Sequence, residues 1–148
     1  RAGIKDIEDV VRLRTTFQSE LHPQARVDEA QFVELTRQYV SEKLPAEELL
    51  VWFAEEDGQI IGTGGLVFWH RPPTSNCLSS KHAYVLNMYT LPEHRGKGVA
   101  TLLLEQIIEY VKTTATQSIT LHATEMGRAV YERLGFVART GEMQLMIE

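Results

Sequence analysis

Hydrophobic and polar residues alternate along the first third of the chain at the spacing typical of amphipathic helices. The pattern predicts a helix over Lys5–Leu21, which the sequence His22-Pro23 should end. A second helix is predicted from an N-cap at Asp28 to about Lys43, before the helix-breaking Pro45. The apolar face of the first helix is expected to comprise Ile7, Val10, Val11, Leu13, Phe17 and Leu21. The buried side of the second is expected to comprise Phe32, Val33, Tyr39 and Val40.

The next two apolar segments have the length of β-strands and predict a hairpin. Leu49–Ala54 and Gln59–Trp69 flank the sequence Glu55-Glu56-Asp57-Gly58, whose Asp-Gly pair favours a tight turn. Glycines inside the second strand indicate a bulge or a close backbone approach; they are Gly62, Gly64 and Gly65. The aromatic residues Trp52, Phe53, Phe68 and Trp69 are expected in the core. His70–Lys81 has the composition of a loop.

The second half of the chain alternates strands and helices. The expected elements are a strand at Ala83–Leu91, a helix from Val99 to about Lys112, a strand at Ser118–Ala123, a helix at Glu125–Leu134 closed by Gly135, and a hairpin of Phe136–Ala138 with Met143–Ile147 around Thr140-Gly141. Parallel pairing is expected only where a helix crosses over, between the Ala83 and Ser118 strands. The order of elements therefore predicts a mixed α/β fold with four helices around one sheet.

Composition limits the classes of protein that this chain can belong to. Its 148 residues predict a single domain over 1–148, and its net charge of -5 argues against nucleic acid as the main partner. No apolar run approaches the ~20 residues that a membrane span needs, so no membrane partner is expected. The single Cys77 excludes an internal disulfide and favours a reducing, cytoplasmic setting. The sequence begins at Arg1 rather than Met, which leaves open that an N-terminal strand is truncated.

The most informative segment is Arg95-Gly96-Lys97-Gly98-Val99-Ala100, because it links a predicted strand to the start of a predicted helix. The first backbone N–H groups of a helix have no internal partners and lie at its positive dipole end, so they attract anions. Glycines permit positive φ angles and let a phosphate come close to the backbone. The segment predicts a phosphate-binding turn, although it fits neither GxxxxGK[ST] nor GxGxxG.

Two motifs make the chain resemble the GNAT superfamily of acetyl-coenzyme A-dependent N-acetyltransferases. Arg95, Gly98 and Ala100 fill the family's phosphate signature [Q/R]-x-x-G-x-[G/A], and Tyr131–Phe136 (YERLGF) matches its C-terminal Y-E-[K/R]-x-G-F segment. The resemblance implies a GNAT-like fold in which a mostly antiparallel sheet contains one splayed parallel strand pair. It also implies acetyl-CoA as co-substrate and transfer of acetyl to a primary amine by direct attack through a tetrahedral intermediate.

The resemblance also implies which residues bind the cofactor. They are Met88, Tyr89, Thr90, Arg95, Gly96, Lys97, Gly98, Val99, Ala100, Thr101, Thr124 and Tyr131. The sequence departs from the family at Thr124, where Asn is common, at Gly127, where Ala is usual, and at Thr90, where a hydrophobic residue is usual. We expect altered contacts to the cofactor arm, because Thr can still donate or accept a hydrogen bond.

Tyr131 is the candidate general acid for the leaving thiolate, while the general base stays open. The candidate bases are His82, His94, His122, Glu20, Glu125 and a chain of waters. Cys77 is a weaker candidate for a covalent nucleophile, because nothing near it in sequence would activate it. One Cys and five scattered His provide no metal-ligand spacing, so no metal is expected.

The sequence does not identify the acceptor, which could be a small molecule or a protein amine. The loops expected to select it are Glu20–Arg26, His70–Lys81 and the final hairpin. A homodimer is left open. The competing hypothesis is a non-catalytic coenzyme A-binding sensor or interaction module, since a fold does not fix a function.

Overall fold

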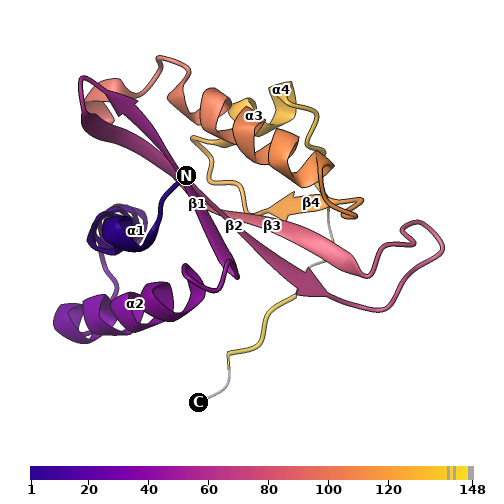
Figure 1. The fold of residues 1–148 in the computed structure, drawn as a ribbon, viewed down its shortest axis with the longest axis horizontal. Coiled ribbons are helices and arrows are strands. Elements are labelled where there is room, and N and C mark those ends of the chain that lie inside the picture. The colour runs from indigo at the N-terminus through magenta and orange to yellow at the C-terminus, as the bar shows by residue number, and fades with distance from the viewer. Residues whose placement is uncertain (140, 142, 147–148) are drawn as a thin grey trace.

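Four strands form one sheet in the order β1-β2-β3-β4, and helices cover both of its faces (Figure 1). The structure, a computed structural model, describes residues 1–139, 141 and 143–146. The elements are η1 (Ile4–Asp6), α1 (Ile7–Leu21), α2 (Glu29–Lys43), β1 (Leu49–Glu56), β2 (Gln59–His70), β3 (Lys81–Thr90), η2 (Pro92–His94), α3 (Val99–Lys112), β4 (Ile119–Leu121) and α4 (Arg128–Arg133). β1–β2 and β2–β3 pair antiparallel, whereas β3–β4 pair parallel. The mixed sheet with one parallel pair is therefore confirmed.

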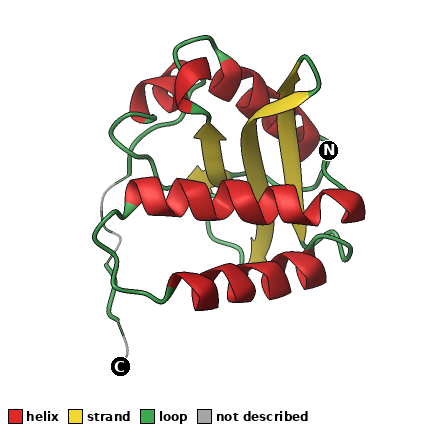
Figure 2. Cartoon of the chain, turned by 90° about the vertical axis from the view of Figure 1, so that its left-hand side faces the viewer, coloured by secondary structure: helices red, strands yellow, loops and turns green. Residues whose placement is uncertain are grey.

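Helices α1 and α2 lie against one face of the sheet, side by side in Figure 2, and α3 and α4 lie on the other face. The first layer buries Val10, Val11, Val40, Leu44, Leu49 and Val51. Asp28 caps α2 as expected, because its carboxylate accepts a hydrogen bond from the Gln31 N–H at 2.7 Å. The prediction that Tyr39 is buried is wrong, since it is 46% exposed. Val40 is buried as predicted, and Thr36, four positions away and thus on the same face of α2, is buried with it.

The glycines of β2 let α3 pack closely on the sheet. A Cβ on Gly62 would lie 2.8 Å from Val99 Cγ1, and one on Gly64 would lie 3.0 Å from Ile107 Cδ1. The register of β2 against β1 also shifts between Gly62 and Ile60, with Ile61 as the extra residue beside Gly62. Both predicted reasons for these glycines, a bulge and a close approach, are therefore confirmed.

A bulge in β3 at Asn87 was not foreseen from the sequence. Asn87 has a φ of +56°, and the ladder passes from Leu86 opposite Gly65 to Tyr89 opposite Thr63. Its side-chain oxygen accepts a 2.7 Å hydrogen bond from Arg14 Nη1 of α1. A bulge takes backbone groups out of the ladder and bends the strand. It lies close to where the ladder between β3 and β4 ends, at Val85 and Leu121.

The predicted C-terminal hairpin is wrong for the residues that the structure describes. Residues 136–139, 141 and 143–146 form no strand, while Thr140 and Ile147 of that prediction lie outside the described residues. A hairpin arm of only three residues offers few ladder hydrogen bonds, and neither described arm pairs with β4. Met143 is 95% exposed.

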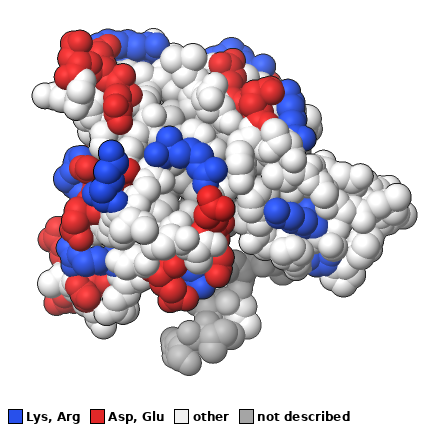
Figure 3. Space-filling view, viewed as in Figure 1, with Lys and Arg blue, Asp and Glu red and all other residues white. Residues whose placement is uncertain are grey.

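Two further elements are shorter than expected. β4 keeps only Ile119–Leu121, and α4 begins at Arg128, because Thr124–Gly127 form a turn before it. Acidic and basic side chains are interspersed over the face in Figure 3. Within the described residues, no helix has the length and apolar character needed to cross a membrane.

Candidate functional site

The predicted phosphate-binding turn joins η2 to α3 and is open to approach. Gly96 and Gly98 have φ angles of +74° and +83°, which non-glycine residues rarely adopt, and Gly98 is the N-cap of α3. A Cβ at either glycine would meet no atom of the described residues within 4 Å. The free N–H groups at the start of α3 therefore adjoin space that an anion can enter.

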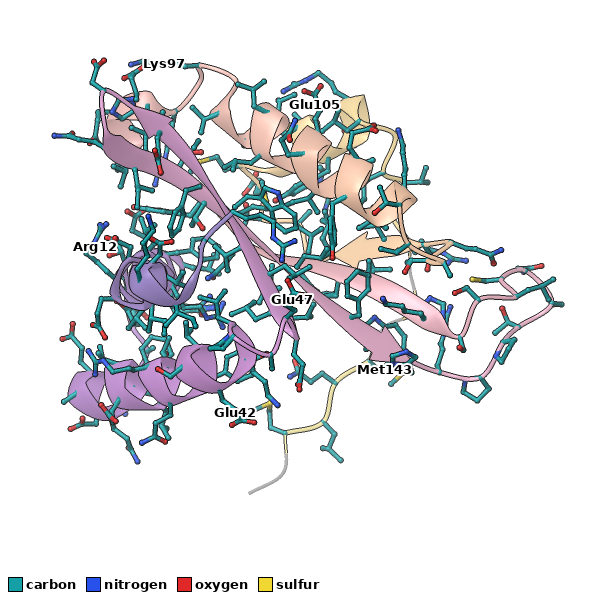
Figure 4. All side chains as sticks on the ribbon, viewed as in Figure 1. Arg12, Glu42, Glu47, Lys97, Glu105 and Met143 are labelled. Carbon is teal, nitrogen blue, oxygen red and sulfur yellow. The ribbon has the colours of Figure 1, made fainter. Side chains whose placement is uncertain are left out.

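A cavity of about 330 Å³ opens at this turn. Every predicted cofactor-binding residue except Lys97 lines it. Lys97 lies on the outer edge of the turn, as Figure 4 shows. Six further residues of the lining were not expected at the cofactor site from the sequence: Phe17, Leu21, His94, Met126, Val130 and Arg133. The sequence did contain an indication for Phe17 and Leu21. Both are apolar residues near the end of α1, beyond the residues of this helix that are buried in the core.

Arg95 holds the start of this turn against the end of β3. Its Nε donates to the Thr90 carbonyl at 2.9 Å, and its Nη2 lies 2.6 Å from Glu20 Oε2 at the end of α1. Its guanidinium carbon also lies 5.5 Å from the centre of the Tyr89 ring. Two nitrogens of the guanidinium are thus bonded within the protein, so Arg95 stabilises the position of the turn.

Tyr89 and Glu20 complete a network with Arg95. The Tyr89 hydroxyl donates a short hydrogen bond to Glu20 Oε1. Burial, with the Glu20 hydrogen bond, raises the pKa of Tyr89 to about 12. Hydrogen bonds from Tyr89 and Arg95 lower the pKa of Glu20. Glu20 is therefore a poor base, because its ionised form is already stabilised by two donors.

Tyr131 lies on α4 with its ring held between Phe136 and Gly127. The Phe136 ring is 6.0 Å away and edge-on, and a Cβ on Gly127 would lie 2.9 Å from Tyr131 Cε2. Thr124 Oγ1 accepts the Gly127 N–H at 3.1 Å, which leaves the hydroxyl proton of Thr124 for another partner. Burial raises the pKa of Tyr131, so the phenol stays protonated.

A second cavity of about 920 Å³ adjoins the first, and Tyr131 is the described residue that lines both. This second cavity runs along β4, past Thr120, which pairs with Tyr84 of β3, to His122, which follows the last paired residue, Leu121. On its wall, the Tyr84 hydroxyl lies 2.6 Å from His122 Nδ1. The linings of the two cavities therefore meet at Tyr131.

The remaining candidate bases differ in what surrounds them. His82 is 1% exposed and uses both ring nitrogens, with Nδ1 2.7 Å from Ser118 Oγ and Nε2 accepting Arg71 Nε at 3.0 Å. Desolvation by burial, reinforced by Arg71, lowers the pKa of His82. His94 lines the first cavity with Nδ1 3.3 Å from Glu56 Oε2. Only His122 of these histidines lies in the second cavity.

Glu125 and Cys77 are absent from the described linings of both cavities. Cys77 lies in the loop after β2, with Sγ 3.6 Å from Gln117 Oε1. A covalent role for Cys77 thus gains no support from the geometry. Across the described part of the chain, no group of His, Cys, Asp or Glu is arranged to hold a metal ion.

Comparison with known proteins agrees with this architecture. A predicted acetyltransferase from Clostridium acetobutylicum, solved with acetyl-CoA, superimposes with a TM-score of 0.89 at 32% identity, covering 98% of this chain and 92% of that one. A GCN5-related N-acetyltransferase from Ralstonia eutropha JMP134 superimposes with a TM-score of 0.84 at 29% identity, covering 99% and 95%.

Relatives in sequence carry the same kind of name. The chain is 30% identical over 100 residues to the uncharacterized N-acetyltransferase YsnE of Bacillus subtilis, covering 64% of this chain and 60% of that protein. It is 24% identical over 112 residues to human N-acetyltransferase 8B, covering 74% of this chain and 45% of the human protein. The chain thus spans less than two thirds of the length of these relatives. A profile of the acetyltransferase (GNAT) family matches residues 7–136. With this match, the phosphate turn and the Tyr131 segment, the chain belongs to the acetyltransferase (GNAT) family of acyltransferases.

Proposed function

We propose that this protein transfers the acetyl group of acetyl-CoA to a primary amine by direct attack on the thioester. The observation that carries the proposal is the position of Tyr131, which lines both the cavity at the phosphate turn and the cavity along β4. A substrate in each cavity would lie beside this half-buried tyrosine. The bound acetyl-CoA of the Clostridium neighbour supports the choice of co-substrate.

The first cavity suits coenzyme A in charge and in shape. Its pyrophosphate would lie on the backbone N–H groups of the turn from Gly96 to Thr101, at the positive end of α3. Its pantetheine arm, which carries amides, would run beside Met88–Thr90. The bulge at Asn87 takes backbone out of the ladder there, and an N–H freed in this way can donate to the carbonyl oxygen as it gains charge.

The reaction then needs two proton transfers. The neutral amine attacks the carbonyl carbon, and the C=O electron pair moves to oxygen. Collapse of this tetrahedral intermediate breaks the C–S bond, and the thiolate leaves beside the hydroxyl of Tyr131. The amine proton passes to a base, for which we propose His122, because it lies in the second cavity with Nδ1 bonded to Tyr84.

Free thiol release from acetyl-CoA, measured against a panel of primary amines, tests the proposal. We expect amine-dependent thiol release in the wild type and a lower kcat in His122→Gln, with unchanged affinity for coenzyme A. Coenzyme A binding without thiol release for any amine would favour the alternative, a non-catalytic binding module. Normal turnover in His122→Gln would transfer the role of base to water.

A further inference from the structure

Arg71, just after β2, is a cation in the lining of the second cavity that has no counter-ion among the described residues. Its Nε donates to His82 Nε2 at 3.0 Å, and its guanidinium carbon lies 5.3 Å from the centre of the Trp69 ring. It forms no ion pair with any residue that the structure describes, although Arg1, Arg12, Arg37 and Arg95 all do. Because only the Nε of Arg71 is bonded to His82, its two Nη groups remain to bind a ligand in the cavity.

His82, which accepts the hydrogen bond from Arg71, is buried, and its hydrogen bonds fix its tautomer. Because His82 Nε2 accepts from Arg71, the ring proton is on Nδ1, which donates to Ser118 Oγ at 2.7 Å. The His82 ring also lies 4.9 Å from the Trp69 ring. A neutral histidine cannot neutralise Arg71, so it orients the guanidinium and leaves its charge intact.

The charges around the second cavity have the sign opposite to that of the whole chain. The chain carries a net charge of -5, yet the charged residues of this lining are Arg71, Arg128, Arg139 and the single acid Glu132. None of these three arginines pairs with a described carboxylate. The lining therefore favours a ligand that bears a negative group.

The register of the sheet indicates how far this negative group lies from the reacting amine. His82 is paired opposite Trp69, and the bulge at Asn87, where the thioester is expected, lies five residues further along β3. A strand rises about 3.3 Å per residue, so the two points are on the order of 15 Å apart. A single free amino acid is too short to bridge them, whereas an extended peptide spans that distance with about five residues.

Building on the proposed function, we infer that the acceptor is a peptide whose N-terminal amine reacts and whose carboxylate, about five residues away, is bound by Arg71. A planar guanidinium matches a carboxylate with two parallel hydrogen bonds. Trp69 beside it adds an apolar surface for the same segment of the peptide.

The test compares two amidated peptides with free N-termini that differ only in Glu or Gln at the fifth residue. Calorimetry should give the Glu peptide up to about 5-fold higher affinity for the wild-type protein, the upper end of what an ion pair at an exposed site provides. Arg71→Ala should abolish this preference and leave the affinity for the Gln peptide unchanged, and Arg71→Lys should restore part of it. Arg37→Ala, which removes an arginine of α2 outside both cavities, serves as the control and should keep the preference.

A third peptide, with Glu at the second residue, should bind like the Gln peptide, because its carboxylate cannot reach Arg71. Equal affinity for the Glu and Gln peptides in the wild type, or a preference that persists in Arg71→Ala, would overturn the inference. Thiol release with the same peptides separates it from the proposed function. Turnover with equal affinity for the Glu and Gln peptides would contradict only the role of Arg71. A binding preference for the Glu peptide without thiol release would contradict only the proposed acetyl transfer.

Discussion

Replacing Gly127 by Ala should slow acetyl transfer by displacing the phenol of Tyr131. The new Cβ would lie 2.9 Å from Tyr131 Cε2, 3.3 Å from Tyr131 Cζ and 3.2 Å from Thr124 Oγ1. Carbon atoms in contact prefer a separation of about 3.5–4.0 Å, so the ring must move by roughly 1 Å. Misplacement of a reacting group by about 1 Å can cost about 10²-fold in rate, and we expect kcat to fall by ~10- to 100-fold.

The fold should tolerate this substitution. Gly127 has φ of -82° and ψ of -20°, a right-handed conformation that Ala adopts without strain. Removing glycine freedom from the unfolded chain typically stabilises by about 0.4–1 kcal/mol, which offsets part of the cost of the ring shift. The thermal midpoint should therefore change little while kcat falls.

The assay is single-turnover thiol release at saturating acetyl-CoA, for wild type, Gly127→Ala, Tyr131→Phe and the double variant. If the new methyl group acts through the hydroxyl, Gly127→Ala should cost little more in the Tyr131→Phe background, and the two losses will not add. Gly3→Ala is the matched control, because a Cβ there has only Asp6 Oδ2, at 3.9 Å, within 4 Å. Full activity in Gly127→Ala, or fully additive losses, would refute the reasoning.

Further outcomes are expected. Gly98→Val should lose most of its affinity for coenzyme A by calorimetry, whereas Gly58→Val, with a similar φ of +77° in the β1–β2 turn, should lose stability but not affinity. Tyr131→Phe should lower kcat by ~10²-fold with coenzyme A affinity unchanged, and a near-normal kcat where chemistry limits turnover would assign proton delivery to water. The kcat/KM should rise between about pH 6 and 9, because the amine and its base must be neutral, and a flat profile would contradict this order of events. Because the pKa of His82 is lowered in the folded protein, its contribution to stability is complete above about pH 6.5, the pKa of an unfolded histidine, and is lost as pH falls toward the pKa of the folded state. The thermal midpoints of wild type and His82→Gln should therefore converge at low pH. A constant difference between the two midpoints would contradict this.

Local signals in the sequence were sufficient for most of the fold. The α3 boundaries, Val99–Lys112, agree with the predicted helix, because a glycine N-cap and a strong apolar stripe mark both the start and the buried face. The Asp57-Gly58 turn is present, with both residues at positive φ. Helix and hairpin signals of this kind depend on residues close in sequence, so they are readable without tertiary contacts.

What the sequence missed depends on contacts between distant segments. The bulge at Asn87 had one local signal, an asparagine within an apolar strand, but its cause is the bond to Arg14 on α1, 73 positions away. The hydrogen bonds that Tyr89 and Arg95 donate to Glu20 likewise join three segments that are far apart in sequence. The proposal that His122 rather than another of the five histidines is the base depends on the course of the second cavity along β4.

The buried setting of Tyr131 also limits what kind of acid it can be. A phenol with an ordinary pKa near 10 gives its proton to a thiolate of pKa near 8.5 only at a cost of about 2 kcal/mol. Burial raises the pKa of Tyr131 further, so a full transfer within the closed site is more costly still. The same desolvation strengthens a hydrogen bond from the phenol to a sulfur that is gaining charge. We therefore propose that Tyr131 stabilises the departing thiolate through its O–H, with the proton reaching sulfur as the C–S bond breaks or afterwards from solvent.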